Sequence, residues 1–185
     1  MFLFQQVIFN EHTCGDVINL VNNWEEAGLY VRKNSDEYTL LINPKLRKSK
    51  RAEITVHSDN IIFQNIKLAL NSIGFDIVSN KLEGAILKYE EGDFLYKHND
   101  LTDHNNTRLL CCVLQLNNWS DYEGGEFIVY SEHGELTASK EIGTLMVFKP
   151  ELYHETKPII SGTRYSLVIW GLSEDIKPFK RSNLI

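Results

Sequence analysis

His98 and Asp100 stand one residue apart, and His154 follows further along the chain. On an extended strand, residues i and i+2 point to the same face, so His98 and Asp100 can converge on one ion. Two histidines and one carboxylate that leave other positions open form the ligand set of non-haem Fe(II) oxygenases. The same residue types also serve zinc hydrolases, so zinc is the alternative metal on ligand type alone.

Arg164 lies ten residues after His154, in a stretch that ends in apolar residues. A planar guanidinium binds a carboxylate through two parallel hydrogen bonds. Burying it without an anion is costly, and no acidic residue is an obvious partner in the sequence. This favours the carboxylate of a ligand over a structural ion pair, and a dicarboxylate cosubstrate fits.

Short β-rich runs must position these side chains, because helical periodicity disappears beyond Phe75. Five runs are separated by turn-forming residues, at 85–89, 109–116, 126–130, 144–148 and 165–170. Many short strands without intervening helices favour a sandwich or jelly roll over a parallel α/β sheet.

The amino-terminal part mixes expected strands and helices. We expect strands at 1–9, 38–43 and 52–57, and amphipathic helices at about 13–29 and 60–72 that pack on one sheet. The basic run 45–51 is interpreted as a solvated loop rather than a contact for an acidic or nucleic-acid partner. We interpret 176–185 as a polar tail.

The composition fits one soluble globular domain. The chain has 185 residues, is 43% hydrophobic and 24% charged, and carries a net charge of −6. Nucleic acid and membranes are therefore not the expected partners. The three cysteines, Cys14, Cys111 and Cys112, form no C-x-x-C pair, and neither a signal peptide nor a membrane span is recognised. We expect a reducing, cytoplasmic location.

Several motifs keep a fixed order over about residues 85–172: Y-x-x-G before H-x-D, then R, L-N, G-G-E, a distant H, and G-x-R-x-S before W. In this order they resemble the prolyl 4-hydroxylase-like family of Fe(II)/2-oxoglutarate dioxygenases. The resemblance implies a mainly β double-stranded β-helix, a jelly roll, buttressed by amino-terminal helices. It further implies one dioxygenase domain over 1–185, with a helical support region at 1–80 and a catalytic core at 81–173.

The resemblance also implies roles for single residues. Fe(II) would be bound by His98, Asp100 and His154, and 2-oxoglutarate would be clamped by Arg164. Further cosubstrate contacts are expected from Tyr89, Ser166 and Gln115, although Gln115 stands where several relatives carry a tyrosine. Weaker candidates for contact with substrate are Arg108, with a surface ion pair as the alternative, and Trp119 in a connecting loop. His104 is expected to face substrate or solvent and not the metal.

The implied reaction uses Fe(II), 2-oxoglutarate and O2 to hydroxylate an unactivated C–H bond, with ascorbate as a candidate accessory reductant. A prolyl residue of a peptide or protein is the leading substrate, and a free amino acid or other small molecule is the alternative. A different class, a non-catalytic cupin-like binding module, needs neither the open metal site nor Arg164. No feature of the sequence specifies an oligomeric state.

Overall fold

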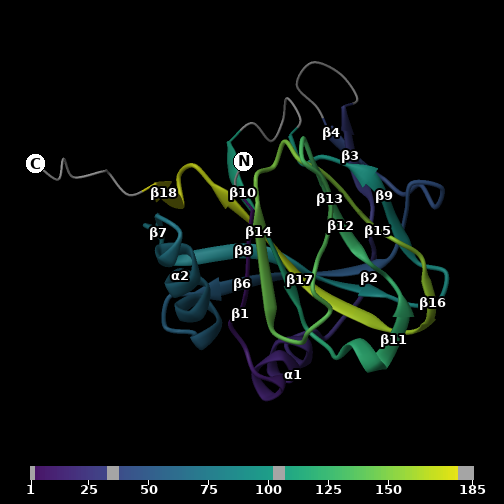
Figure 1. Ribbon diagram of the computed structural model, residues 1–185, viewed down its shortest axis with the longest axis horizontal. Coiled ribbons are helices and arrows are strands. Elements are labelled where there is room, and N and C mark those ends of the chain that lie inside the picture. The colour runs from purple at the N-terminus through teal and green to yellow at the C-terminus, as the bar shows by residue number, and fades with distance from the viewer. Residues whose placement is uncertain (1–2, 33–37, 102–106, 179–185) are drawn as a thin grey trace, which may run out of the picture.

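The computed structural model describes residues 3–32, 38–101 and 107–178, and its strands form two main antiparallel sheets (Figure 1). The larger sheet has seven strands, in the order β1 (Leu3–Val7), β14 (Thr144–Phe148), β10 (Arg108–Gln115), β17 (Arg164–Leu172), β8 (Lys81–Tyr89), β6 (Lys50–His57) and β2 (Glu25–Glu26). The smaller has five, in the order β13 (Gly134–Thr137), β12 (Phe127–Ser131), β15 (Tyr153–Thr156), β9 (Phe94–His98) and β5 (Arg47–Lys48). The predicted mainly β jelly roll is confirmed.

Short two-stranded pairs and helices complete the architecture. The pairs are β11 (Tyr122–Gly124) with β16 (Ile159–Gly162), β7 (Phe75–Ile77) with β18 (Ile176–Pro178), and β3 (Leu29–Arg32) with β4 (Tyr38–Leu41). The helices are α1 (Glu11–Asn19), α2 (Ile61–Ser72) and the 3-10 turn η1 (Trp119–Asp121). Neither α-helix of this described part is long and apolar enough to cross a lipid bilayer.

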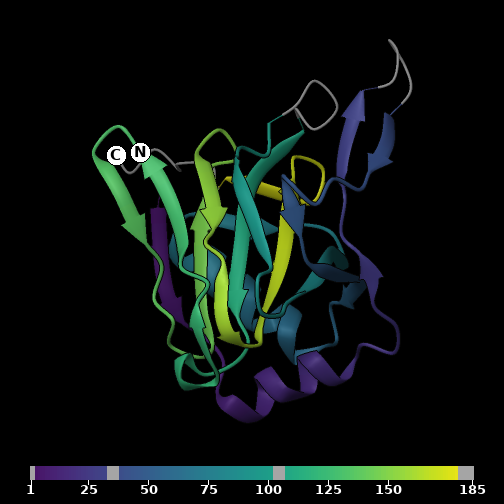
Figure 2. The ribbon, with the colours of Figure 1, turned by 90° about the vertical axis from the view of Figure 1, so that its right-hand side faces the viewer.

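The main hydrophobic core lies between the helices and the larger sheet. α2 lies beside β6, β7 and β8 (Figure 1), and α1 runs across one end of the sheets (Figure 2). Buried side chains of α2, such as Phe63 and Ile66, share one cluster with sheet residues such as Ile86 and Cys112. The helices therefore buttress one face of the larger sheet, as expected, and leave its other face to the smaller sheet.

The space between the two sheets has its own apolar residues. Cys111, Phe127 and Phe148 belong to one cluster there, whereas Cys112 belongs to the core beneath the helices. Adjacent residues of β10 thus point to opposite faces, as strand geometry predicts. The face that carries Cys111 is the one that lines the interior of the jelly roll.

Gly124 and Gly125, the two glycines of the G-G-E motif, form a tight turn between β11 and β12. Both have positive φ, 76° and 64°, and a Cβ at Gly124 would lie 2.3 Å from the carbonyl oxygen of Pro158. No other residue type adopts this conformation as readily in so little space. The tight turn brings β11 against β16 just before Arg164.

The structure differs from the prediction in three places. The first helix ends at Asn19 instead of continuing to 29. The basic run 45–51 is not a solvated loop, since it forms β5 and the start of β6. Part of the expected polar tail, Ile176–Pro178, pairs with β7, and residues 179–185 lie outside the described residues.

A pairing between distant residues explains the first two differences. Glu25 and Glu26 are the cross-strand partners of Arg51 and Lys50. Opposite charges placed side by side across a sheet edge stabilise the pairing. Glu25 and Glu26 fall within the expected first helix, and Lys50 and Arg51 fall within the expected loop. In the structure they instead pair as β2 and β6 at one edge of the larger sheet.

Candidate functional site

Strand pairing places His98 directly opposite His154. β9 and β15 are antiparallel neighbours in which His154 pairs with His98 and Thr156 pairs with Leu95. Between these pairs, two residues of β9, Tyr96 and Lys97, face the single Glu155 of β15, which is a β-bulge, and a bulge re-aims side chains. Both imidazoles come together, with ring centroids 4.2 Å apart.

Asp100 lies just beyond β9 and completes a three-residue cluster. Its backbone N–H donates to the carbonyl of Pro150 at 2.9 Å, which ties the segment after β9 to the segment before β15. His98 Nε2 lies 3.7 Å from Asp100 Oδ1, and His154 Nε2 lies 3.9 Å from Asp100 Oδ2. One potential ligand atom from each residue lies within 4.8 Å of the others.

These three side chains fit a metal ion. Two ligand atoms that each lie about 2.1 Å from one metal at right angles are about 3 Å apart. The separations of 3.7 and 3.9 Å are wider than this, and small side-chain shifts would bring the atoms onto one ion. The Nδ1 atoms of His98 and His154 lie 3.0 Å from the carbonyl oxygens of Tyr96 and Leu152. Donation to a carbonyl fixes the proton on Nδ1 and leaves Nε2 as the free lone pair for a metal.

Burial keeps the cluster in the protonation states that a metal requires. It lowers the pKa of His98 to about 4, with help from the neighbouring His154, and it also lowers the pKa of His154. Burial alone would raise the pKa of Asp100, but the charges of His154 and Arg108 and a hydrogen bond from Cys111 outweigh it and lower that pKa. Two neutral imidazoles and a carboxylate are the result at neutral pH.

Arg164 begins β17 and is almost completely buried, with 3% of its surface exposed. Its Nη1 donates to Ser166 Oγ at 3.1 Å, and its guanidinium carbon lies 5.6 Å from the ring centre of Tyr89 on the paired strand β8. Within the described residues, the bond to Ser166 is the one hydrogen bond of the Arg164 guanidinium, and no carboxylate pairs with this group. A buried cation without an anion is costly, so Arg164 is suited to receive an anionic ligand.

One cavity of about 430 Å³ contains both the cluster and the arginine. Its lining includes His98, Asp100, His154 and Arg164, together with the predicted contacts Tyr89, Ser166 and Arg108. Its volume is typical of a site for a small molecule. The structure therefore places the three-residue cluster and the buried arginine in one space.

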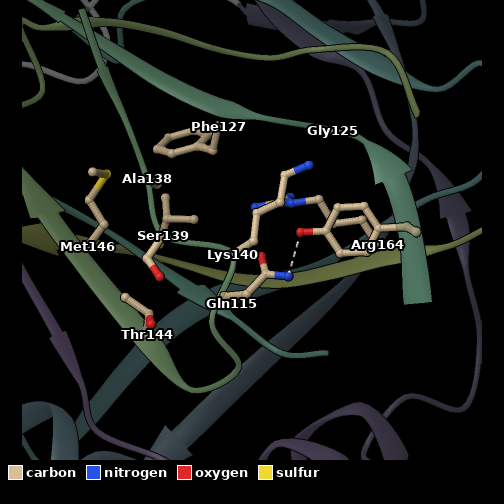
Figure 3. Close-up of a pocket in the computed structure, with 11 residues that line it drawn as sticks. Gln115, Gly125, Phe127, Ala138, Ser139, Lys140, Thr144, Met146 and Arg164 are labelled. Carbon is tan, nitrogen blue, oxygen red and sulfur yellow. Dashed lines mark hydrogen bonds between the residues drawn. The ribbon is translucent and has the colours of Figure 1, made fainter. Parts of the chain in front are cut away.

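Gln115 lines a smaller pocket, which it shares with Arg164 (Figure 3). Its amide donates to the hydroxyl of Tyr122 at 2.9 Å and to the carbonyl of Asn117 at 3.0 Å. It does not line the large cavity, and its contact with the cosubstrate stays a prediction.

Arg108 and Trp119 lie at opposite ends of the jelly roll. Arg108 Nη1 lies 3.4 Å from Asp100 Oδ1, and its guanidinium lies over the ring of Trp170 at 4.5 Å. Trp119 follows the other end of β10, is 64% exposed and lines a separate surface pocket. Trp119 is thus not among the residues that line the large cavity, and its contact with substrate stays a prediction. His104 lies outside the described residues.

Sequence reasoning missed Arg47, which lines the large cavity from β5. Its Nε donates to Ser49 Oγ at 3.0 Å and its Nη1 to the carbonyl of Gly28 at 3.4 Å. Burial lowers its pKa, and the nearby Tyr89 partly offsets that effect. The spacing of Arg47, Ser49 and Arg51 was the available signal, since alternate residues of a strand share a face.

Fold and site together define a jelly roll with a two-histidine, one-carboxylate cluster at one end of a cavity and a buried arginine at the other. The model of the 2OG-Fe(II) oxygenase superfamily matches residues 84–171. The matched segment contains His98, Asp100, His154 and Arg164, so the cluster and the arginine lie in the part of the chain that is similar to this superfamily.

Solved structures share the fold at low sequence identity. A prolyl-4-hydroxylase of Pseudomonas putida has a TM-score of 0.65 at 20% identity, with 91% of this chain and 90% of that chain covered. A prolyl hydroxylase of Trichoplax adhaerens, in complex with a peptide fragment of the hypoxia inducible factor oxygen degradation domain, has a TM-score of 0.66 at 19% identity. That alignment covers 93% of this chain and 84% of the other.

Curated relatives match over shorter stretches. A PKHD-type hydroxylase of Psychrobacter sp. (strain PRwf-1) is 34% identical over 61 residues, which are 33% of this chain and 24% of the relative. A PKHD-type hydroxylase of Idiomarina loihiensis is 27% identical over 87 residues, which are 46% of this chain and 40% of the relative. The chain therefore spans less than half the length of these relatives.

Proposed function

We propose that this protein is an Fe(II)- and 2-oxoglutarate-dependent dioxygenase that hydroxylates a prolyl residue of a peptide or protein. The observation that carries the proposal is the single cavity that holds His98, Asp100, His154 and Arg164 together. Binding metal and a dicarboxylate in one space is what such a reaction requires.

His98, Asp100 and His154 would hold the iron, and Arg164 would hold the distal carboxylate of 2-oxoglutarate. Bound iron supplies the oxidative chemistry, in which 2-oxoglutarate, O2 and a C–H bond give succinate, CO2 and a C–OH group. The guanidinium of Arg164 fixes the cosubstrate in one orientation, and Ser166 Oγ, 3.1 Å away, orients that guanidinium. Phe127 and Phe148 line the same cavity and keep water from the reacting groups.

The assignment to a prolyl residue rests on two supports. The solved structures with the same fold include a prolyl hydroxylase bound to a peptide. The cavity also includes Trp170 and Arg108 beside the metal cluster, an aromatic face and a cation suited to a proline ring and to a peptide carbonyl. The buried free thiols Cys14, Cys111 and Cys112 suit the reducing cytoplasm, where we propose that the enzyme acts.

The test is a proline-containing peptide library incubated with the protein, Fe(II), 2-oxoglutarate and O2, with and without ascorbate. Mass spectrometry should show peptides that gain one oxygen on a prolyl ring, in step with the succinate released. Gain of oxygen on a free amino acid, with no peptide modified, would instead assign a small-molecule hydroxylase. Binding of ligands without any succinate would point to a non-catalytic jelly roll.

A further inference from the structure

The carboxylate of Asp100 accepts two hydrogen bonds on the same oxygen. The thiol of Cys111 and the indole N–H of Trp170 both lie 3.0 Å from Asp100 Oδ2. Cys111 on β10 and Trp170 on β17 are direct cross-strand partners. Neighbouring positions on two central strands of the larger sheet therefore present two donors to one atom.

The other oxygen of Asp100 has different surroundings. Oδ1 lies 3.7 Å from His98 Nε2 and 3.4 Å from Arg108 Nη1, and His154 Nε2 lies 3.9 Å from Oδ2; all three distances are longer than an ordinary hydrogen bond, so only Cys111 and Trp170 hold the carboxylate through close donors. The side chain is 12% exposed, so few water molecules compete for either oxygen. The two oxygens of this carboxylate are thus made unequal by the protein.

We propose that Cys111 and Trp170 are positioning residues that hold Asp100 Oδ2 and so present Oδ1 alone to the metal. This inference rests on the proposed metal site and adds the groups that orient its carboxylate. A carboxylate fixed in this way binds through one oxygen and leaves more of the metal open for cosubstrate and O2. Without the two donors, it can rotate about its Cβ–Cγ bond and present either oxygen or both.

Groups that hydrogen-bond to metal ligands contribute measurably to metal affinity. Their loss typically weakens metal binding about 10- to 100-fold. Cys111 is fully buried, at 0% exposure, so no water molecule is in place to replace its thiol. The Cys111→Ala variant should therefore bind metal at least about tenfold more weakly than the wild type.

Cys112 offers a matched control on the same strand. It is also a buried thiol, at 1% exposure, but it points to the opposite face and packs in the core beneath the helices. Cys112→Ala removes the same atoms and creates a comparable void without touching Asp100. Any loss that the two variants share reflects packing, and a loss confined to Cys111→Ala reflects the carboxylate.

The experiment is an anaerobic titration of the full chain with Co(II) alone, followed by calorimetry and by the visible absorption of bound Co(II). Cys111→Ala should lower the affinity by about tenfold or more and alter the Co(II) spectrum, while Cys112→Ala should leave both unchanged. Cys111→Ser, which keeps a donor, should recover part of the affinity. Trp170→Phe removes only the other donor and should act in the same direction, so it tests the inference even if Cys111→Ala does not fold.

Two negative outcomes have separate meanings. Wild-type affinity and spectrum in both Cys111→Ala and Trp170→Phe would overturn the positioning role and leave the metal site standing. Failure of the folded wild-type protein to bind Co(II) or Fe(II) at all would overturn the proposed function and this inference with it.

Discussion

Replacing Arg164 with methionine separates a ligand-binding arginine from a structural one. The residue is 3% exposed, and among the described residues its guanidinium has one hydrogen bond, to the neutral Ser166, and no anion that offsets its burial. Methionine fills similar volume without the charge. We therefore expect the free energy of unfolding without cosubstrate to stay the same or to rise, because an uncompensated buried charge is removed.

The affinity for 2-oxoglutarate, in contrast, should fall when Arg164 is replaced. A hydrogen bond to a charged group contributes about 1.5–3 kcal/mol, and a bidentate pair contains two of them. Loss of about 3 kcal/mol corresponds to a dissociation constant for 2-oxoglutarate that is about 100-fold higher. Arg164→Lys keeps the charge but not the fork, and it should lose less affinity than Arg164→Met.

Thermal unfolding with and without 2-oxoglutarate, in the presence of Mn(II), measures both effects in one assay. The wild type should be stabilised by the cosubstrate and the Arg164→Met variant should not. Arg108→Met is a useful comparison, because Arg108 does have a carboxylate partner, Asp100, and its loss should destabilise the free protein. A variant at 164 that is strongly destabilised yet keeps the full cosubstrate shift would refute the reasoning.

Three further predictions concern other residues. The metal-free protein should lose stability as the pH falls from about 6.5 towards about 4, because burial lowers the pKa of His98 to about 4 and the unfolded state therefore takes up the proton first. Urea unfolding at several pH values should show this loss, and His98→Asn should make the free energy of unfolding depend less on pH. Arg47→Ala should lower kcat/KM by about tenfold, because it removes a partly buried cation from the cavity wall. Lys48→Ala, which removes an exposed lysine that is paired with the buried Asp93, should not; equal effects on kcat/KM would remove Arg47 from the site. Trp119→Ala should change kcat/KM by less than about twofold and stability by less than about 0.5 kcal/mol, since the ring is exposed and lines a pocket separate from the cavity that holds the metal cluster; a tenfold loss of activity would support Trp119 as a substrate contact.

The parts of the fold that the sequence predicted well have local causes. Strands such as Thr144–Phe148 were recognised because β-branched and apolar residues between turn formers have few other solutions. The metal cluster was predictable because its residue types are rarely combined for any other purpose. The β-bulge between His98 and Leu95, which aligns the two histidines, was not predictable, because a bulge is a property of two paired strands.

The parts that were predicted wrongly depend on residues far away in the sequence. Residues up to Leu29 fit a helical period, yet Glu25 and Glu26 gain partners in Arg51 and Lys50 only when an edge strand forms. The same pairing turns the end of the basic run into a strand, and a second distant pairing, of β5 with β9, places Arg47 at the wall of the cavity. Cys111 was passed over for a similar reason, since its partner Asp100 and its neighbour Trp170 meet it only through the β10–β17 register.

Succinate formation from 2-oxoglutarate by the purified chain tests the central claim most directly. Wild-type protein with Fe(II) and O2 should release succinate, even slowly without a substrate, and removal of the metal by a chelator should stop the release. His154→Ala, which takes one ligand from the cluster, should release none while remaining folded. Succinate formation that persists in His154→Ala, or its absence from metal-loaded wild-type protein, would contradict the account.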